Sequence, residues 1–287
     1  MNNTNRSNNR NEIRRNNKKF EGARNEQRRD IRKKDIYEES AALDRLEGRN
    51  SVMEALKSNR TINKILVAKG ERGGSINKII AIAKDKGIVI QEVEKSKLDN
   101  ESTTFSHQGV IAYVSVKEYV EIEDILKISK ERGEEPFLII LDEITDPQNL
   151  GSILRTADAV GAHGVIIPKR RAVGLSSVVS KASAGAVEYV PVARVSNIVQ
   201  AIESLKKRNV WIVGTEAGAE KAFYQSDLLG PIAIVVGNEG EGIGRLIKEK
   251  CDFLVKIPMM GKISSLNAAV AGSVMMYEVL KQRNSKC

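Results

Sequence analysis

The chain has 287 residues, of which 41% are hydrophobic and 29% charged, a composition typical of a globular protein of about two domains. It has no apolar run long enough to cross a bilayer and no apolar stretch near its start, so neither a membrane span nor a secretory signal is predicted. Two cysteines, Cys251 and Cys287, are too few for a disulfide framework or a metal site and predict free thiols in a reducing cytoplasm.

The net charge of +9 is concentrated in the first residues of the chain. Residues 1–34 contain 12 Lys or Arg and 4 Asp or Glu, so the remainder of the chain is nearly neutral. Because this segment has few large apolar residues, residues 1–44 are predicted to be a disordered basic tail. Such a tail is either a solvated leader without a specific role or a cationic arm that strengthens nucleic-acid binding through phosphate contacts.

Residues 45–118 are predicted to form a small α/β unit. A short helix follows Asn50, and a second helical pattern covers 76–83 and ends before Gly87. The strands of this unit are predicted at 62–68, 88–93 and 110–116. The charged interval 119–136, with a weak helical pattern at 122–128, is predicted to be a linker.

Residues 137–287 alternate short apolar strands with amphipathic helices. The strands are predicted at 137–141, 164–167, 189–192, 210–213, 232–236 and 253–257. Helices are predicted at 150–160 and 197–207. This alternation indicates an α/β fold with a parallel sheet that is covered on both faces.

Three segments of the second unit have more unusual residues than a connecting turn needs. The first, 141–157, follows a predicted strand and opens a helix, where ligands bind in α/β sheets. Leu150, Ile153 and Leu154 define the buried face of this helix, so Arg155 projects from another side. An arginine at that position either binds an anion or is a solvated surface residue.

The second segment, 235–243, is rich in glycine and follows an apolar strand, which permits a close approach of backbone to a ligand. A similar turn occupies 214–218. Neither turn has the spacing of a phosphate-binding loop or of a dinucleotide fingerprint, which disfavours a nicotinamide dehydrogenase. A simple left-handed turn explains either segment equally well.

The third segment, 257–271, combines a turn at Pro258 and Gly261 with a helix of small residues. Ser265 is predicted to cap this helix, which would start near Leu266. The small residues let another backbone pack closely against the helix. Elsewhere, the isolated His107 and His163 do not suggest a metal site, and no Ser/His/Asp motif is present.

Together these segments resemble the SpoU (TrmH-like) branch of the SPOUT RNA methyltransferases. The resemblance covers most of residues 46–282 and rests on Asn149…Arg155, Gly237-Asn238-Glu239-Gly240 and Ile257-Pro258-Met259…Ser265-Leu266-Asn267. With Glu47-Gly48-Arg49-Asn50 and His107-Gln108-Gly109, the first unit is similar to the substrate-binding domain of one subgroup. That subgroup methylates a guanosine 2′-hydroxyl in 23S rRNA.

The resemblance implies a parallel sheet with a deep trefoil knot, which sequence patterns alone would not suggest. It also implies S-adenosylmethionine as the cofactor and a homodimer as the active form, without a metal or a membrane partner. The implied cofactor contacts are Gly214, Thr215, Gly237, Ile257, Met259, Ser265 and Leu266. The positions that match the family's catalytic residues are Asn149, Arg155, Glu239, Ser265 and Asn267.

We therefore expect a SPOUT domain at 137–287 that methylates the ribose 2′-hydroxyl of a guanosine in 23S rRNA of the large subunit. Two alternatives remain: the same chemistry on a tRNA or another rRNA site, and a non-catalytic RNA-binding or ribosome-assembly protein. Arg155 is either a general base or an electrostatic stabiliser. We favour the second role, in which Arg155 binds a phosphate and is oriented by Asn149 and Glu239.

Overall fold

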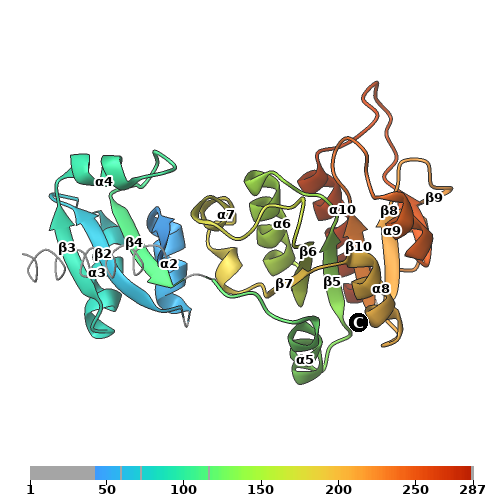
Figure 1. Ribbon diagram of the computed structural model, residues 1–287, viewed down its shortest axis with the longest axis horizontal. Helices are drawn as coiled ribbons and strands as arrows, with labels where there is room; N and C mark the ends of the chain where they lie inside the picture. Colours follow the sequence, from blue (N-terminus) through green and yellow to red (C-terminus); the bar gives the residue numbers. More distant parts are fainter. Residues whose placement is uncertain (1–42, 59, 72, 116, 286–287) are drawn as a thin grey trace, which may run out of the picture. The chain divides into compact units, whose positions relative to one another are not determined.

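The computed structural model describes residues 43–58, 60–71, 73–115 and 117–285, and these residues contain two β-sheets (Figure 1). The predicted basic tail lies outside these ranges, apart from its last two residues, and so do Val116 and Cys287. Residues 44–287 pack into one compact body, which includes both the first and the second unit predicted from the sequence. In the described ranges, no helix is long and apolar enough to cross a membrane.

The first sheet has four strands in the order β1-β4-β2-β3, with β2 parallel to β3 and antiparallel to β4. Its strands are β1 (Leu43–Glu47), β2 (Ile62–Ala68), β3 (Val89–Val93) and β4 (Val110–Ser115). Its helices are α2 (Arg49–Lys57), α3 (Gly74–Asp85) and α4 (Lys95–Glu101). Apolar residues of α2 and α3 pack on one face of this sheet, and Leu98 of α4 packs on the other. The sequence did not predict β1 and α4, because both are short and rich in charged residues.

The interval predicted to be a linker contains helix α5 (Ile122–Arg132). Glu121 and Asp124 form a capping box at its start, and Gly133 ends it with a φ of 66°. Ile125 is fully buried in the core of the second sheet. A Cβ atom on Gly164 would overlap Ile125, so α5 packs directly on the strand that begins there.

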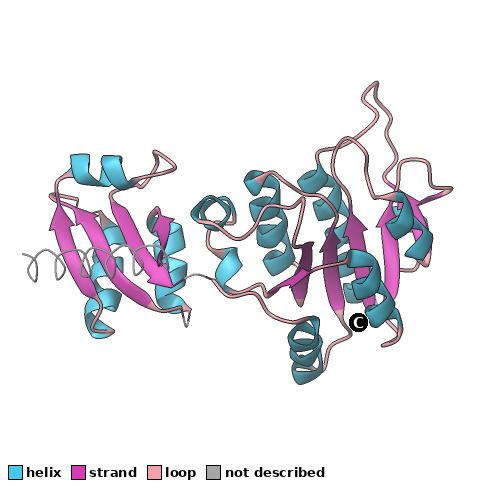
Figure 2. Ribbon diagram, viewed as in Figure 1, coloured by secondary structure: helices cyan, strands magenta, loops and turns pink. Residues whose placement is uncertain are grey.

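The second sheet has seven strands in the order β7-β6-β5-β10-β8-β11-β9, and every recorded strand pair is parallel. Its strands are β5 (Phe137–Leu141), β6 (Gly164–Pro168), β7 (Val192–Val195), β8 (Trp211–Thr215), β9 (Lys221–Ala222), β10 (Ile232–Val236) and β11 (Phe253–Lys256). Its helices are α6 (Pro147–Ala159), α7 (Ser177–Ala182), α8 (Ile198–Lys206), α9 (Arg245–Lys250) and α10 (Ala268–Asn284). Two 3-10 helices are η1 (Ala186–Glu188) and η2 (Phe223–Gln225). Figure 2 shows how these helices alternate with the strands.

Both faces of the seven-stranded sheet are covered, as the sequence predicted. In β5, Phe137 and Ile139 point into a cluster that also contains residues of α6, α7 and α10. Leu138 and Ile140 point into a second cluster, with residues of α5, α8 and α9. This alternation along one fully buried strand follows from the two-residue period of side chains in a strand. The apolar runs therefore identified the central strands reliably.

One strand prediction was wrong in position. The segment 189–192, predicted as a strand, is mostly outside β7, and the residues before it form the helix η1. Val190 is buried but not paired in the sheet, whereas Pro191 accepts a hydrogen bond from the Val165 nitrogen through its carbonyl. Proline has no backbone N–H for the ladder, so regular pairing starts only after it.

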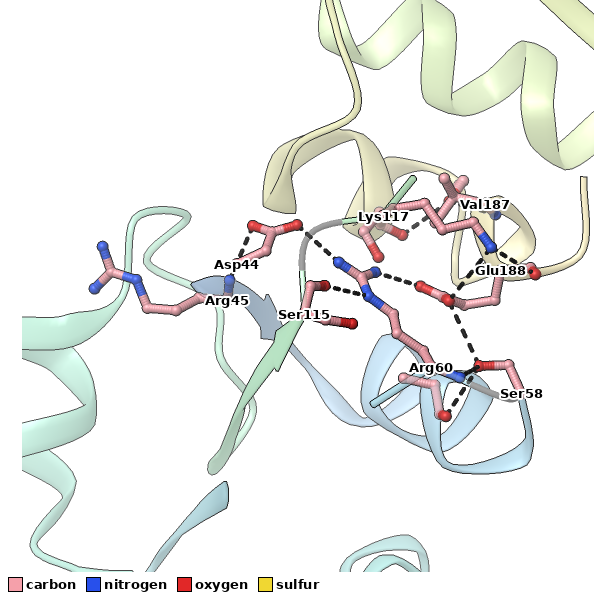
Figure 3. Close-up of polar contacts among 11 residues, drawn as sticks. Asp44, Arg45, Ser58, Arg60, Ser115, Lys117, Val187 and Glu188 are labelled. Atoms are coloured by element: carbon pink, nitrogen blue, oxygen red, sulfur yellow. Dashed lines mark hydrogen bonds and ion pairs between the residues drawn. The ribbon is translucent and has the colours of Figure 1, made fainter. Parts of the chain in front are cut away.

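A buried ion pair joins Arg60, which precedes β2, to Glu188 at the end of η1 (Figure 3). The guanidinium and carboxylate are 2.6 Å apart, and the two side chains are 4% and 0% exposed. Arg60 also pairs with Asp44 at 3.0 Å and donates to the Ser115 carbonyl at 2.9 Å. Lys117 donates to the backbone oxygen of Glu188 at 3.0 Å. A carboxylate this deep is tolerated because several donors surround it.

Candidate functional site

Three loops at the carboxyl ends of β8, β10 and β11 surround a cavity of about 210 Å³. The end of β8 contributes Thr215, the loop after it contributes Glu216 and Ala217, and the loop after β10 contributes 237–242. The remaining wall comes from the segment between β11 and α10 and from the first turn of α10. Ligands bind at this edge of parallel sheets, so the cavity is the candidate site.

Six of the seven predicted cofactor contacts line this cavity. They are Thr215, Gly237, Ile257, Met259, Ser265 and Leu266. The seventh, Gly214, is buried inside β8 and is not part of the lining. A Cβ atom there would come within 2.5 Å of Leu254 and 2.9 Å of the Cys251 sulfur, so the packing of β8 against β11 and α9 requires a glycine. The structure therefore gives Gly214 a packing role next to the cavity.

The loop after β10 folds back on itself. A Cβ atom on Gly237 would overlap the backbone of Gly242, and Gly242 itself has a φ of 69°. The side chain of Asn238 accepts from the nitrogens of Gly240 and Glu241 at 2.9 and 2.8 Å. These contacts require glycine at both crossing positions, since neither a side chain at 237 nor an ordinary residue at 242 fits.

Asp142, directly after β5, holds the far end of this loop. Its carboxylate accepts from the Gly244 nitrogen at 2.8 Å. Burial raises the pKa of Asp142, the Gly244 hydrogen bond lowers it in part, and the neighbouring Glu143 raises it further. No sequence motif singled out Asp142. An acidic residue that directly follows a buried strand was the available signal.

Asn149, Glu239 and Asn267 meet beside the cavity, and Glu239 is part of its lining. The Asn149 side-chain nitrogen donates to Glu239 Oε1 at 2.8 Å. The Asn267 side-chain nitrogen donates to Glu239 Oε1 at 2.6 Å and to the Asn149 side-chain oxygen at 2.8 Å. The same Glu239 oxygen accepts from the Ala268 nitrogen at 3.3 Å. The first turn of α10 thus holds a carboxylate at the positive end of the helix dipole. We call these three residues the polar trio.

Asn267 caps α10, whereas Ser265 was predicted to do so. The Asn267 side-chain oxygen accepts from the nitrogens of Ala269 and Val270 at 3.0 and 3.2 Å, and the helix starts at Ala268. The prediction was wrong because Ser265 and Asn267 are equally good capping residues by type. The choice depends on Glu239, which binds the Asn267 amide from a distant part of the chain. Ser265 is exposed and lines the cavity.

Arg155 does not join the polar trio. It is exposed on α6 and has no hydrogen bond or ion pair with another described residue. It is six positions after Asn149 in the chain, which places it about 9 Å along the helix from Asn149 and roughly 120° around it. Thr156 instead faces α10, where its hydroxyl lies 2.9 Å from that of Ser273. The structure therefore gives no contact through which Asn149 or Glu239 would orient Arg155.

The two motifs of the first unit pack together. Gly48 precedes α2 with a φ of 91°. The backbone nitrogen of Arg49 donates to the side-chain oxygen of Gln108 at 3.2 Å, and the Arg49 Nε donates to the backbone oxygen of Gln108 at 3.0 Å. His107 accepts from the Gly109 nitrogen at 3.0 Å through Nδ1, which leaves its Nε2 to donate to Asp99 at 2.9 Å. His107 thus has a structural role.

Glu47 binds the loop that follows α4. This fully buried residue accepts hydrogen bonds from Ser102, Thr103 and Thr104, through their hydroxyls and through two backbone nitrogens. Burial alone would raise the pKa of Glu47, but these hydrogen bonds outweigh it and lower the pKa to about 2. The carboxylate therefore stays charged inside the protein because the loop supplies its donors.

This lowered pKa predicts a loss of stability in acid. Because the folded-state pKa of Glu47 lies below the ordinary glutamate value of 4.5, the contribution is complete above that pH and disappears as the pH falls towards 2. Its size is on the order of 3 kcal/mol. Urea unfolding between neutral pH and about pH 3 measures it. We expect Glu47→Gln to be less stable at neutral pH and to have a flatter pH profile. If the free energy of unfolding changed equally with pH in the wild type and in Glu47→Gln, the result would contradict this expectation.

The remaining candidates for metal or thiol chemistry have structural explanations. His163 accepts from the Phe137 nitrogen at 3.0 Å and contacts Glu134 at 3.0 Å, and burial lowers its pKa. Burial, followed by the charge of Asp252, raises the pKa of Cys251 to about 12, so its thiol is unreactive at neutral pH. Among the described residues, no group of His, Cys, Asp or Glu could hold a metal ion.

Comparison with known proteins gives a family match for each of the two parts of the chain that contain a sheet. Residues 45–120 match the family described as RNA 2′-O ribose methyltransferase substrate binding, and residues 136–277 match the SpoU rRNA methylase family. A Bacillus subtilis protein named for the TrmH family of tRNA/rRNA methyltransferases is 53% identical over 237 residues, 83% of this chain and 95% of its own length. A Staphylococcus saprophyticus protein with the same family name is 49% identical over the same shares.

A solved structure extends this likeness to the fold. The SpoU methyltransferase AviRb from Streptomyces viridochromogenes, in complex with the cofactor AdoMet, has a TM-score of 0.72 at 25% identity. The likeness covers 86% of this chain and 92% of that one. The chain therefore belongs to the SpoU (TrmH-like) family of S-adenosylmethionine-dependent RNA methyltransferases.

Proposed function

We propose that this RNA methyltransferase transfers its methyl group to the ribose 2′-hydroxyl of a guanosine in 23S rRNA. The observation that carries the proposal is the polar trio beside a cavity lined by three loops, with Glu239 in the cavity wall. The match of residues 45–120 to a substrate-binding family supports an rRNA substrate, because the resemblance associates this extra unit with the rRNA enzymes.

The cavity suits S-adenosylmethionine. Ile257, Met259 and Leu266 offer apolar surface for a flat ring, and the glycine-rich loop after β10 exposes backbone groups for polar contacts. The cofactor supplies an electrophilic methyl group when bound. We further propose that the segment between β11 and α10 passes through the knot implied by the resemblance. The three cavity loops would then form the knotted region.

The polar trio can position the reacting hydroxyl and hold its proton. Glu239 Oε1 accepts three hydrogen bonds, whereas Oε2 accepts none from the described residues. We assign to Oε2 the acceptance of the ribose hydroxyl hydrogen. An arginine is a permanent cation in proteins, so Arg155 has an electrostatic role, binding the phosphate next to the target ribose and stabilising the developing alkoxide. Ser265 shapes the cavity wall.

The assembly and the division of the chain are part of the same proposal. Residues 45–118 bind substrate RNA, residues 119–136 connect the two units, and residues 137–287 carry out the chemistry. The active form is a homodimer. Val270 and Tyr277 of α10 support a dimer, because they are exposed, apolar and seven residues apart, which places them on one face of the helix. The free thiol of Cys251 suits the reducing cytoplasm in which we place the enzyme.

Two alternatives lead to different results in one experiment. The protein is incubated with labelled S-adenosylmethionine and total RNA, and the methylated nucleoside is mapped. Label at a guanosine 2′-hydroxyl of 23S rRNA supports the proposal, and label in tRNA or at another rRNA site identifies a different substrate. A protein that binds RNA but neither binds S-adenosylmethionine nor transfers label would be a non-catalytic RNA-binding or assembly protein.

Arg155→Ala tests the assigned phosphate contact in the same assay. We expect kcat/KM to fall by about 100-fold or more, as for other lost charge-stabilising donors, with unchanged S-adenosylmethionine affinity. Arg155→Lys keeps the charge and should retain part of the activity. Arg208→Ala is the matched control. Arg208 is also an exposed arginine, but it precedes β8 and so lies at the amino end of that strand, whereas the cavity is at the carboxyl ends. Wild-type turnover in Arg155→Ala would refute the assignment.

A further inference from the structure

The loop between α4 and β4 presents a single exposed aromatic ring. Phe105 is 87% exposed and makes no recorded contact with another aromatic ring or cation. Its φ of 52° lies in the left-handed region, which phenylalanine adopts only at an energetic cost. Glycine or asparagine would adopt this backbone more easily. The fold therefore accepts strain for a side chain that gains nothing from internal packing.

The residues on both sides of Phe105 are held firmly. On one side, Glu47 accepts hydrogen bonds from Ser102, Thr103 and Thr104. On the other side, Arg49 holds Gln108 through two hydrogen bonds. The loop is thus fixed at each end, and its exposed tip is the aromatic ring. A ring fixed in this way loses little conformational entropy when it contacts a partner.

The surroundings of the ring fit a nucleic acid better than a protein. Among the described residues of the first unit, the only other exposed large apolar residue is Val89, on strand β3, so there is no contiguous apolar patch of the kind that docks a protein. A cation lies beside the loop instead. Lys181 donates to the Thr104 hydroxyl at 2.8 Å and has no ion pair with another described residue, whereas Arg49, which contacts Gln108, is paired with Glu71 at 3.0 Å. A phosphate matches the charge of Lys181.

We propose that Phe105 stacks on an unpaired base of the substrate RNA and so anchors the RNA to the first unit. This inference rests on the proposed function, in which residues 45–118 bind substrate RNA. The proposal assigns to the Phe105 side chain a part of the affinity for RNA that does not depend on charge. Stacking on an aromatic ring tolerates any base, so Phe105 contributes to affinity and placement and leaves the choice of nucleotide to the catalytic unit.

The test compares variants of the full chain on one RNA. The probe is an in vitro transcript of 23S rRNA, replaced by a tRNA transcript if the mapping experiment finds tRNA to be the substrate. For Phe105→Ala we expect the Kd and KM for RNA to rise by roughly 5- to 100-fold. The kcat at saturating RNA and the affinity for S-adenosylmethionine should not change. The dependence of log K on log salt should keep its slope, because no phosphate contact is lost.

Three further variants separate stacking from folding. Phe105→Asn should keep the melting temperature, since asparagine accepts the left-handed backbone, and should lose affinity like Phe105→Ala. Val89→Ala, the matched control, should bind RNA like the wild type. Phe105→Trp should retain affinity, and its fluorescence should be quenched by RNA in a Trp211→Phe background, where it is the only tryptophan.

The outcomes distinguish this inference from the proposed function. If the wild-type protein methylates no RNA, the proposed function fails. If it methylates RNA while Phe105→Ala and Phe105→Asn retain the wild-type KM, the stacking inference fails alone. A fall in the salt slope of Phe105→Ala would also overturn the inference, because it would indicate lost phosphate contacts.

Discussion

Asn267→Asp should lower the rate of methyl transfer by about 100-fold or more while leaving the protein folded. The aspartate keeps the side-chain oxygen that caps α10 but loses the nitrogen that donates to Glu239 and Asn149. It also places a second carboxylate within hydrogen-bond distance of Glu239, and the two negative charges repel. Glu239 would then lose the position from which it receives the hydroxyl hydrogen. Steady-state methylation at saturating cofactor and RNA measures the effect.

Asn197→Asp is the matched control for this variant. Asn197 also caps a helix, α8, through its side-chain oxygen, which accepts from the Gln200 nitrogen at 3.2 Å, and it makes no contact with the polar trio. An aspartate there should leave activity unchanged and keep or slightly raise stability, since a negative charge suits a helix N-terminus. Equal activities of the two variants would show that Asn267 serves only as a cap. Thermal melts of both proteins check that neither result comes from unfolding.

Arg60→Met should destabilise residues 44–287 by about 3–5 kcal/mol. Methionine removes the guanidinium and leaves the carboxylate of Glu188 buried and without its closest ion-pair partner. Only the more distant Lys117, at 3.9 Å, would remain to offset the charge. The cost comes from the uncompensated charge rather than from lost volume, because methionine fills most of the space. Denaturant unfolding, monitored by circular dichroism, measures it.

The double variant Arg60→Met/Glu188→Leu should recover most of this loss, because it removes both charges. Arg208→Met is the control, since Arg208 pairs with Glu123 at 2.5 Å but both side chains are largely exposed. That variant should cost less than about 1 kcal/mol. If Arg60→Met cost no more than Arg208→Met, or if the double variant were less stable than the single one, burial would not explain the energetics of the pair.

The sequence predicted the central strands well and the peripheral elements poorly. The strands β5 and β10 are continuous apolar runs, buried on both faces, and no other structure accommodates such runs so readily. The helices α4, α7 and α9 are only six or seven residues long and have little apolar periodicity. Their formation depends on packing against elements far along the chain, which no local pattern reports.

In the candidate site, too, some features could be predicted from the sequence and others could not. The residues of the cavity and of the polar trio were found by their place in ordered motifs, and all except Gly214 and Arg155 lie together at one edge of the sheet. Their hydrogen bonds were not predictable, because the Asn267 cap depends on Glu239, 28 residues away in the chain. The burial of Glu188 could not be predicted for a related reason. It directly precedes the strand predicted at 189–192, where no local pattern marks a buried carboxylate, and the distant Arg60 makes its burial tolerable.

The position of β10 has a consequence for synthesis on the ribosome. This strand lies between β5 and β8 in the sheet but follows both in the chain. While residues 232–236 are still inside the ribosome, a nascent chain exposes an unpaired, apolar edge of β5. The seven-stranded sheet therefore cannot close strand by strand as the chain emerges. Strands β5, β6 and β7 must wait for β10 before they can join β8, and β9 can join only after β11 has followed; during that interval the emerging polypeptide is most exposed to aggregation.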